Sequence, residues 1–393
     1  MRDVLPDLMR WWQAGETVGV GTVVGTWKSA PRQPGASMLV GPDGSAVGSV
    51  SGGCVEGAVY ELGGEARATG SPVLQRYGVS DDDAFTVGLT CGGIIDVFVE
   101  AVDRTTFPEL GAIADDIEAG RPVAVATLIE SDDPARLGRR LVVRPGPDGG
   151  ARVEGGLGSA RLDDAVGADV LGLLRQASTQ IVRYGPDGER RGDEIAVFVA
   201  SYAPKPRMIV FGAIDFAAAV ARVGSFLGYR VTVCDARPTF ATRKRFPDAD
   251  EVVVEWPHRY LRDTEVDERT VVCVLTHDPK FDVPLLEVAL RMPLAYLGAM
   301  GSRRTNDDRA ARLRELGFAD ADLARLHAPI GLDVGGRTPE ETAVSVAAEI
   351  IAARWGGSGA QLRSVSGPIH RGMTTAAPPP ENHPGEPVEQ PLS

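Results

Sequence analysis

Residues 208–235 read MIVFGAIDFAAAVARVGSFLGYRVTVCD, and this stretch decides the fold of the C-terminal half of the chain. A short apolar run at 208–211 predicts a strand, and an alanine-rich segment at 216–227 predicts a helix. A second apolar run follows at 230–234 and ends at Asp235. A buried strand, a helix and another buried strand in this order are typical of a βαβ unit with parallel strands.

The same alternation of strands and helices continues to residue 354. Further strands are expected at 251–254, 270–276 and 294–297, and further helices at 284–291, 305–316 and 339–353. Thr338 and Glu341 form a capping-box pattern at the start of the last helix. The alternation predicts a parallel, doubly wound sheet over residues 204–358. The proline-rich remainder, 359–393, is expected to be disordered.

The first 203 residues contain two copies of one pattern, a first copy at 17–101 and a second copy at 122–201. Five landmarks recur in the same order, 100 to 107 residues apart. They are VGVGTVV at 18 and VAVATLI at 123, PDG at 42 and 147, GG at 52 and 155, RYG at 76 and 183, and VFV at 97 and 197. Strands, glycine turns and a helix in each copy predict a duplicated α+β region.

The two copies differ in their cysteines. The first copy reads SGGCVE at 51–56, where the second reads EGGLGS at 154–159. The first copy also has a longer final loop, 81–93, which contains Cys91 and is missing from the second copy. Since the repeated fold does not require these thiols, we interpret Cys54 and Cys91 as residues kept for chemistry.

Composition and charge exclude several classes of protein. The net charge of −13 and a pI near 5.0 disfavour a nucleic-acid binder or a protein held on anionic lipid. No apolar run reaches the roughly 20 residues of a membrane span, and the first 15 residues do not resemble a signal peptide. The four cysteines show no disulfide spacing, so we expect a reducing, cytoplasmic location.

The paired glycines of the first copy predict a site for an anion. Gly52 and Gly53 precede a predicted helix, where backbone N–H groups converge and the helix N-terminus is electropositive. A thiol at the first helical turn, as predicted for Cys54, is activated as a nucleophile or a soft ligand. Cys91, followed by Gly92 and Gly93, repeats this arrangement. The alternative is that both thiols are small buried hydrophobic groups, as we interpret Cys234 and Cys273 in their predicted strands.

Two charged residues lie close to this site in the sequence. Arg32 lies on a proline-framed loop and is a candidate for clamping a phosphate, with a solvated side chain as the alternative. Glu56 is either a general base beside Cys54 or, as we favour, a carboxylate stabilised at the start of a helix.

These segments resemble the XdhC/CoxI family, whose members are accessory proteins of xanthine dehydrogenase and related molybdenum hydroxylases. The resemblance covers roughly residues 10–355, with 1–203 as the XdhC/CoxI-like domain. It rests on GSVSGGCVEG at 48–57, YG at 77–78, GLTCGG at 88–93, GAMGSRR at 298–304 and PIGLD at 329–333. It implies a Rossmann-like C-terminal domain, so the expected fold is α/β, a duplicated α+β region followed by a Rossmann-like doubly wound sheet.

The resemblance also implies a function. A protein of this family is expected to bind the molybdenum cofactor, to support its sulfuration with a cysteine desulfurase, and to deliver it to a molybdenum hydroxylase. We expect Ser51, Gly52, Gly53, Gly92 and Gly93 to hold the cofactor. Cys54 or Cys91 would contact molybdenum or carry sulfur. Such a protein is a cofactor chaperone rather than a turnover enzyme, and a homodimer is one assembly that it allows.

The C-terminal domain departs from the pattern of dinucleotide-binding proteins. After the strand at 208–211, the chain has Gly212 and Ala213, then Ile214 and Asp215 where a dinucleotide fingerprint needs further glycine and an electropositive helix start. We therefore expect no ordinary NAD(P) binding at this turn. An NAD(P)-dependent oxidoreductase is the alternative function, and only the sheet architecture favours it.

Two other positions in the C-terminal domain are candidate ligand sites. Gly301, Ser302 and Arg303 open a predicted helix and combine N–H donors with guanidinium groups, which favours an anion site. His277 follows a predicted strand, where open sheets place their ligands, but we favour a loop histidine paired with Asp278.

Overall fold

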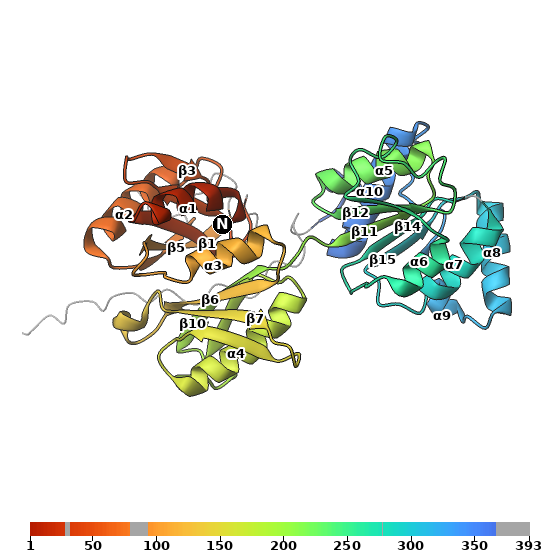
Figure 1. The fold of residues 1–393 in the computed structure, drawn as a ribbon. Helices are drawn as coiled ribbons and strands as arrows, with labels where there is room; N and C mark the ends of the chain where they lie inside the picture. The colour runs from red at the N-terminus through yellow and green to blue at the C-terminus, as the bar shows by residue number, and fades with distance from the viewer. Residues whose placement is uncertain (28–31, 79–92, 277, 367–393) are drawn as a thin grey trace, which may run out of the picture.

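The computed structural model describes residues 1–27, 32–78, 93–276 and 278–366. Two antiparallel sheets occupy the N-terminal part, and a parallel six-stranded sheet occupies the C-terminal part (Figure 1). The α/β fold predicted from the sequence, with a duplicated N-terminal region and a Rossmann-like C-terminal domain, is therefore confirmed.

The first copy forms a five-stranded sheet of order β3-β2-β1-β5-β4 in which all neighbours are antiparallel. Its elements, with a preceding 3-10 turn at Arg2–Val4, are α1 (Leu5–Gln13), β1 (Val18–Trp27), β2 (Ser37–Val40), β3 (Ala46–Gly48), α2 (Glu56–Thr69), β4 (Val73–Tyr77) and β5 (Ile94–Val102). Helix α2 packs across β1, β2 and β5.

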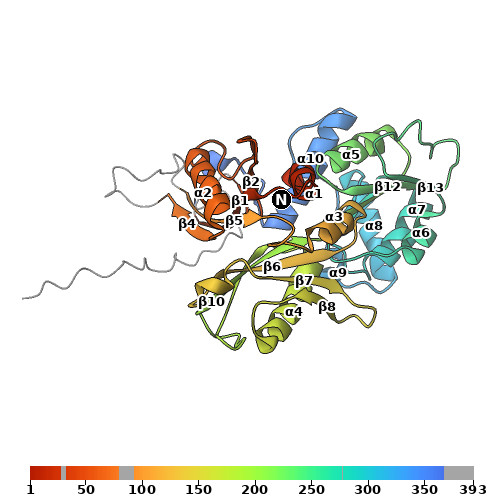
Figure 2. The same ribbon diagram turned by 60° about the vertical axis from the view of Figure 1, so that its left-hand side comes forward.

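The second copy repeats this arrangement as a sheet of order β8-β7-β6-β10-β9, again antiparallel throughout. Its elements are α3 (Leu110–Glu118), β6 (Val123–Glu130), a 3-10 turn (Pro134–Arg136), β7 (Arg140–Pro145), β8 (Ala151–Gly155), α4 (Ala160–Arg175), β9 (Gln180–Tyr184) and β10 (Ile195–Tyr202). Helix α4 packs on this sheet as α2 packs on the first (Figure 2).

The two sheets face each other across one shared core. Val20 and Phe98 of the first sheet belong to the same buried cluster as Val125 and Phe198 of the second, together with side chains of α1 and α3. The alternate side chains of each sheet point to the other face and pack under α2 or α4. This alternation follows from the period of two in a strand and produces four layers, helix, sheet, sheet and helix.

The C-terminal sheet has the order β13-β12-β11-β14-β15-β16, and all of its strands are parallel. The strands are β11 (Arg207–Phe211), β12 (Arg230–Asp235), β13 (Glu251–Val254), β14 (Val271–Val274), β15 (Tyr296–Ala299) and β16 (Leu326–His327). The helices are α5 (Asp215–Phe226), α6 (Pro257–Asp263), α7 (Pro279–Ala289), α8 (Arg303–Glu315), α9 (Asp320–Leu323) and α10 (Pro339–Trp355), with a final 3-10 turn at Leu362–Ser364.

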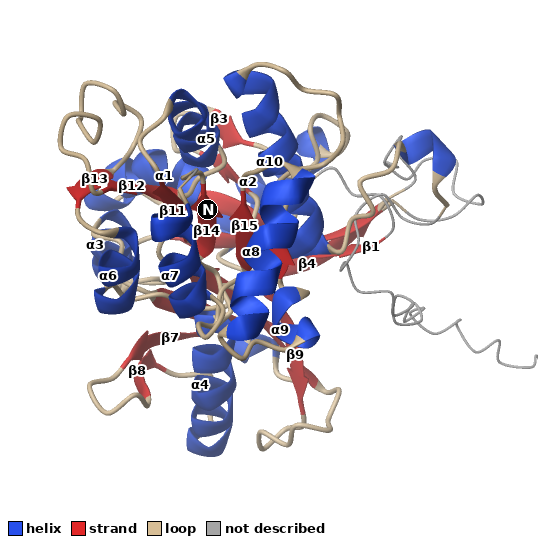
Figure 3. Cartoon of the chain, turned by 90° about the vertical axis from the view of Figure 1, so that its right-hand side faces the viewer, coloured by secondary structure: helices blue, strands red, loops and turns tan. Residues whose placement is uncertain are grey.

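Helices cover both faces of this sheet (Figure 3). Side chains of α5 and α10 join the core on one face, and side chains of α6, α7 and α8 join the core on the other. The predicted capping box of α10 is present, since Thr338 Oγ1 accepts from the Glu341 N–H and Glu341 Oε2 accepts from the Thr338 N–H. Numbered along the chain within this sheet alone, the strands lie in the order 3-2-1-4-5-6, which is that of a Rossmann fold.

The start of one predicted helix is wrong. The sequence predicted this helix over residues 284–291. Helix α7 instead begins at Pro279, where Asp278 caps it by accepting from the Lys280 N–H at 3.1 Å. Pro284 then lies inside the helix.

Candidate functional site

The loop between β3 and α2 is organised around the carboxylate of Glu56. Five backbone N–H groups and two hydroxyl groups donate to its two oxygens at 2.5 to 3.2 Å. The N–H groups belong to Val50, Ser51, Gly52, Gly53 and Val55, and the hydroxyls to Ser49 and Ser51. Glu56 is the first residue of α2, so its charge also lies at the electropositive end of that helix.

These contacts keep Glu56 ionised. Partial burial alone would raise the pKa of the carboxyl, but the hydrogen bonds from Ser51, Ser49 and the backbone outweigh it and lower the pKa to about 2. The favoured interpretation of Glu56 as a carboxylate at the start of a helix agrees with this geometry. A group with so low a pKa is a poor general base.

The glycine N–H groups do converge on an anion, but this anion belongs to the protein. Gly52 donates to Glu56 Oε1 at 3.0 Å, and Gly53 donates to Glu56 Oε2 at 2.8 Å. Both glycines have positive φ, +79° and +118°, and are exposed, and a Cβ at either would meet nothing within 4 Å. The loop therefore offers an open backbone surface, while its N–H groups are bonded to Glu56.

Ser51 supports the loop from inside. It is 3% exposed, and its hydroxyl donates to Glu56 while accepting from the N–H groups of Cys54 and Val55 at 2.9 and 3.0 Å. Its hydroxyl is thereby occupied within the loop.

The sequence predicted Cys54 in the first turn of the helix, and this is wrong. Helix α2 begins at Glu56 with Val55 as its N-cap, so Cys54 lies just outside it. It is partly buried and packs against the core cluster under α2. The loop thus presents a thiol next to two exposed glycines, and Glu56 fixes the backbone that carries it.

The other predicted site residues of the first copy are Cys91, Gly92, Gly93 and Arg32. Cys91 and Gly92 lie outside the described residues. Gly93 is buried and faces the end of β4, since a Cβ on Gly78 would lie 2.1 Å from the Gly93 carbonyl oxygen. Arg32 is exposed, and its charge lies close enough to the N-terminal amine to lower the pKa of that amine, although burial is the larger cause.

The second copy has an ordinary loop at the same place. Leu157, which corresponds to Cys54, is fully buried in the core under α4. Its N–H donates to Asp163 Oδ1 at 2.7 Å, and its carbonyl oxygen accepts from Arg136. In this loop a buried leucine takes the place of the thiol. One hydrogen bond to Asp163 takes the place of the seven hydrogen bonds to Glu56.

Cys234 and Cys273 are packing residues, as the sequence predicted. Both are fully buried in the C-terminal sheet, and burial raises the pKa of each thiol to about 12. Thiols of this kind are unreactive at neutral pH.

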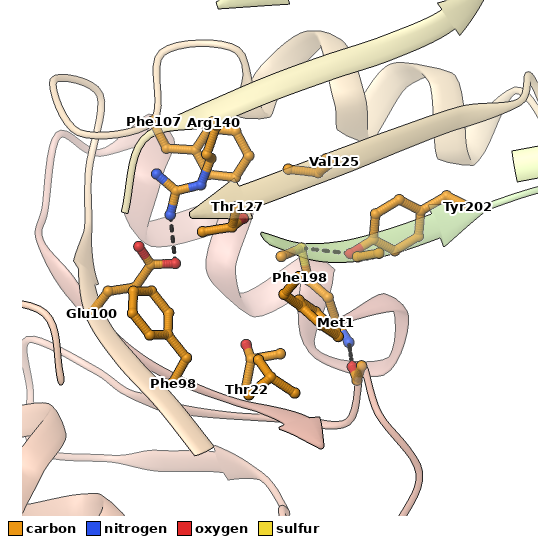
Figure 4. A pocket seen from close by; sticks show the side chains of 13 residues that line it. Met1, Thr22, Phe98, Glu100, Phe107, Val125, Thr127, Arg140, Phe198 and Tyr202 are labelled. Atoms are coloured by element: carbon orange, nitrogen blue, oxygen red, sulfur yellow. Dashed lines mark hydrogen bonds and ion pairs between the residues drawn. The ribbon is translucent and has the colours of Figure 1, made fainter. Parts of the chain in front are cut away.

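A small pocket lies between the two facing sheets (Figure 4). It contains the ion pair of Glu100 on β5 and Arg140 on β7, with an N···O distance of 2.5 Å and side chains only 14% and 6% exposed. Arg140 also donates to the carbonyl oxygens of Thr106 and Gly138, both at 3.1 Å. The pocket lies on the face of the first sheet opposite to α2 and Cys54, so it is separate from the predicted site.

Two aspartates near the turn after β11 form ion pairs with arginines. Asp235 is 3% exposed, accepts from the Ala213 N–H at 2.7 Å and is paired with Arg237 at 2.8 Å. Asp215, at the start of α5, is paired with Arg245 at 3.0 Å. Asp235 ends the second strand of the sheet, where dinucleotide-binding folds place the acidic residue that binds a ribose hydroxyl. Both of its oxygens are engaged within the protein.

The predicted anion site at the start of α8 is exposed. Ser302 caps the helix by accepting from the Thr305 N–H at 3.1 Å, and Gly301 precedes it. Arg303 and Arg304 are exposed, and neither forms an ion pair with another described residue. Helices α2 and α8 lie on opposite sides of the molecule in Figures 1 and 2, so the structure does not bring this site and Cys54 together. His277 lies outside the described residues.

Tyr77, the last residue of β4, was given no role of its own by the sequence pattern. Tyr77 is 5% exposed in the core under α2, and its hydroxyl is buried without a hydrogen-bond partner among the described residues. The RYG landmark occurs in both copies, with Tyr77 in the first and Tyr184 in the second. The repetition of this tyrosine was therefore visible in the sequence. The lack of a hydrogen-bond partner for its hydroxyl among the described residues was not visible there.

Within the described residues, His, Cys, Asp and Glu side chains form no group of three or more that could ligate a metal ion. The helices in that part of the chain are all too short or too polar to span a membrane.

Comparison with known proteins places the chain in a family. Models of the XdhC and CoxI family match residues 11–78 and 116–185, and the XdhC Rossmann domain matches residues 208–350. The matches fall on the two copies and on the parallel sheet described above.

Individual relatives agree with these models. A protein of Bacillus subtilis that is named as a probable xanthine dehydrogenase subunit is 29% identical over 86% of this chain and 94% of its own length. The molybdenum cofactor insertion chaperone PaoD of Escherichia coli is 26% identical over 90% of this chain and 88% of its own. The crystal structure of a xanthine dehydrogenase from Bacillus halodurans matches with a TM-score of 0.63 and 26% identity, over 89% of this chain and 95% of that one. On these matches, this chain belongs to the XdhC and CoxI family.

Proposed function

We propose that this chain is an accessory protein that binds the molybdenum cofactor as cargo and delivers it to a molybdenum hydroxylase of the xanthine dehydrogenase type. The observation that carries the proposal is the Cys54 loop, a thiol beside two exposed glycines on a backbone held by Glu56. The named relatives support it, since one is a molybdenum cofactor insertion chaperone and another is a probable subunit of xanthine dehydrogenase.

The chemistry of the loop suits this cargo. A cysteine thiolate is a soft ligand that matches a sulfur-bound metal, and the side-chain-free surface of Gly52 and Gly53 admits a large planar group. Because the N–H groups of these glycines are bonded to Glu56, contact would be made through their exposed backbone rather than through phosphate-binding donors.

Cys54 or Cys91 would contact molybdenum or carry the sulfur that a cysteine desulfurase supplies. Gly92 and Gly93, and Arg32, would complete the holding surface in the first copy. Gly301, Ser302 and Arg303 would offer a separate anion contact, because Arg303 is exposed without an ion-pair partner among the described residues.

Anaerobic purification tests the proposal. The chain should co-purify with molybdenum cofactor, measured by the fluorescence of the oxidised pterin. A Cys54→Ala/Cys91→Ala double variant should lose most of it, while a Cys234→Ala control, which changes a buried strand thiol, should retain it. Undiminished cofactor in the double variant would contradict the thiol roles.

The alternative, an NAD(P)-dependent oxidoreductase, is favoured only by the Rossmann sheet. The engagement of Asp235 by Ala213 and Arg237 argues against it. Calorimetry with NAD(H) and NADP(H) distinguishes the two, because micromolar binding would support the alternative.

A further inference from the structure

No residue in the described part of the chain provides a hydrogen-bond partner for the hydroxyl of Tyr77. The residue is 5% exposed, and its hydroxyl oxygen is buried without a hydrogen bond to any residue that the structure describes. Burying a hydroxyl in this way destabilises a protein, because the hydrogen bonds with water are lost and not replaced. Phenylalanine would fill the same space without this cost.

The second copy shows what such a tyrosine does when it serves only the fold. Tyr184 ends β9 as Tyr77 ends β4, and its hydroxyl donates to Asp169 Oδ2 on α4 at 3.2 Å. Asp169 is held in turn by Arg190 at 2.8 Å. The corresponding part of α2, residues 62–66, reads LGGEA, and Glu65 there is exposed. The first copy has therefore kept the tyrosine, while no side chain in its described part replaces Asp169 as a partner.

The position of Tyr77 connects it with the Cys54 loop. Tyr77 and Val55 belong to the buried cluster under α2, and Cys54 packs against the same cluster. Strand β4 follows α2 after a short turn and runs back along the sheet, so its last residue lies near the end where α2 begins. The next residue, Gly78, is in close contact with Gly93, which directly follows the Cys91 segment.

We propose that the Tyr77 hydroxyl donates a hydrogen bond to the cargo held at Cys54, to an anionic oxygen or sulfur of the molybdenum cofactor. This inference rests on the proposed function and adds a binding residue to it. Burial raises the pKa of Tyr77 to about 12, so the phenol stays protonated and acts as a donor at neutral pH. Because protein atoms enclose the hydroxyl, cargo reaches it only with a local rearrangement, and the new hydrogen bond favours the bound arrangement.

Tyr77→Phe and its matched control Tyr184→Phe test this inference. Two quantities are measured on the full chain: the Tm of cargo-free protein, and the affinity for molybdenum cofactor in anaerobic fluorescence titration. We expect Tyr77→Phe to leave the Tm unchanged or raise it, and to weaken cofactor binding roughly tenfold. We expect Tyr184→Phe to lower the Tm and to leave cofactor binding unchanged, since it removes the bond to Asp169.

The other outcomes are distinct from one another. If wild type binds the cofactor and Tyr77→Phe binds it equally well, the inference is wrong and the proposed function stands. If Tyr77→Phe lowers the Tm as Tyr184→Phe does, the hydroxyl has a partner within the protein, which also overturns the inference. If wild type binds no cofactor, the proposed function fails, and the inference with it.

Discussion

The two copies of the N-terminal region have the same strand order, yet they differ at the helix start and in the contacts of the tyrosine that ends the fourth strand. In the first copy, the loop before α2 carries Cys54 and is held by seven donors to Glu56. In the second, Leu157 is buried and Asp163 accepts from its N–H. Shared topology therefore fixes where a loop lies, while the residues placed there decide between packing and chemistry.

The two copies also depend on each other. Glu100 of the first and Arg140 of the second form a buried ion pair across the shared core. We expect Glu100→Ala to destabilise the N-terminal region by about 3–5 kcal/mol, because Arg140 is then left buried and unpaired. Urea denaturation of the full chain measures this effect.

A Glu100→Leu/Arg140→Leu double variant is the control for that change. Replacing both charges by apolar groups should recover most of the lost stability, because the penalty arises from the unpaired charge. A double variant as unstable as the sum of its single variants would show that the two residues act separately.

Leu157 and Cys54 occupy corresponding positions and should respond differently to the same truncation. We expect Leu157→Ala to reduce the free energy of unfolding by about 2–4 kcal/mol, since it empties a fully buried site. Cys54→Ala should cost below about 1 kcal/mol, because the thiol is only partly buried and small. Equal losses in chemical denaturation would mean that Cys54 serves the fold as Leu157 does.

Glu56 and Asp163 are the carboxylates of the two corresponding loops. Glu56→Gln should cost about 2–3 kcal/mol, because an amide accepts fewer N–H groups and turns its own donors toward them. Asp163→Asn removes the charge from one backbone contact and should cost about 1 kcal/mol. Thermal and urea unfolding of the pair would contradict this difference if both variants lost the same stability.

The acid dependence of stability gives the smallest effect. The pKa of Glu56 is about 2 in the folded chain, below its ordinary value of 4.5, so its contribution is complete above pH 4.5 and is lost as the pH falls toward 2. The stability gap between wild type and Glu56→Gln should therefore narrow over this range. A gap that stays constant from pH 7 to pH 3 would show that the charge of Glu56 is not what holds the loop.

Much of the fold could be predicted because its signals are local. The strand at 251–254 matches β13, and α10 begins at Pro339 as its capping box indicates. The start of α7 was missed because two prolines, Pro279 and Pro284, both suit a first turn, and the capping contact of Asp278 decides between them. Strand β16 has only two residues and leaves no periodic pattern to detect.

The site was only partly predictable, because its important contacts are between groups that the sequence does not pair. The thiol and the glycines were visible as a motif. The hydrogen bonds from Gly52 and Gly53 to Glu56 depend on how the loop folds back on the helix. That the Tyr77 hydroxyl has no partner in the described part of the chain becomes clear only beside Tyr184. Burial and its consequences for polar groups emerge from tertiary packing, which no local pattern contains.

The shared core between the sheets has a consequence for how this chain can change over generations. Each copy turns one face inward to its twin and the other toward its own helix, and Cys54 and Tyr77 both lie on the helix side. Substitutions around them leave the joint interior intact, so the duplicated half that carries the thiol can acquire new binding properties while its twin preserves the scaffold. The residues that hold the two sheets together are thus distinct from those that we propose bind cargo.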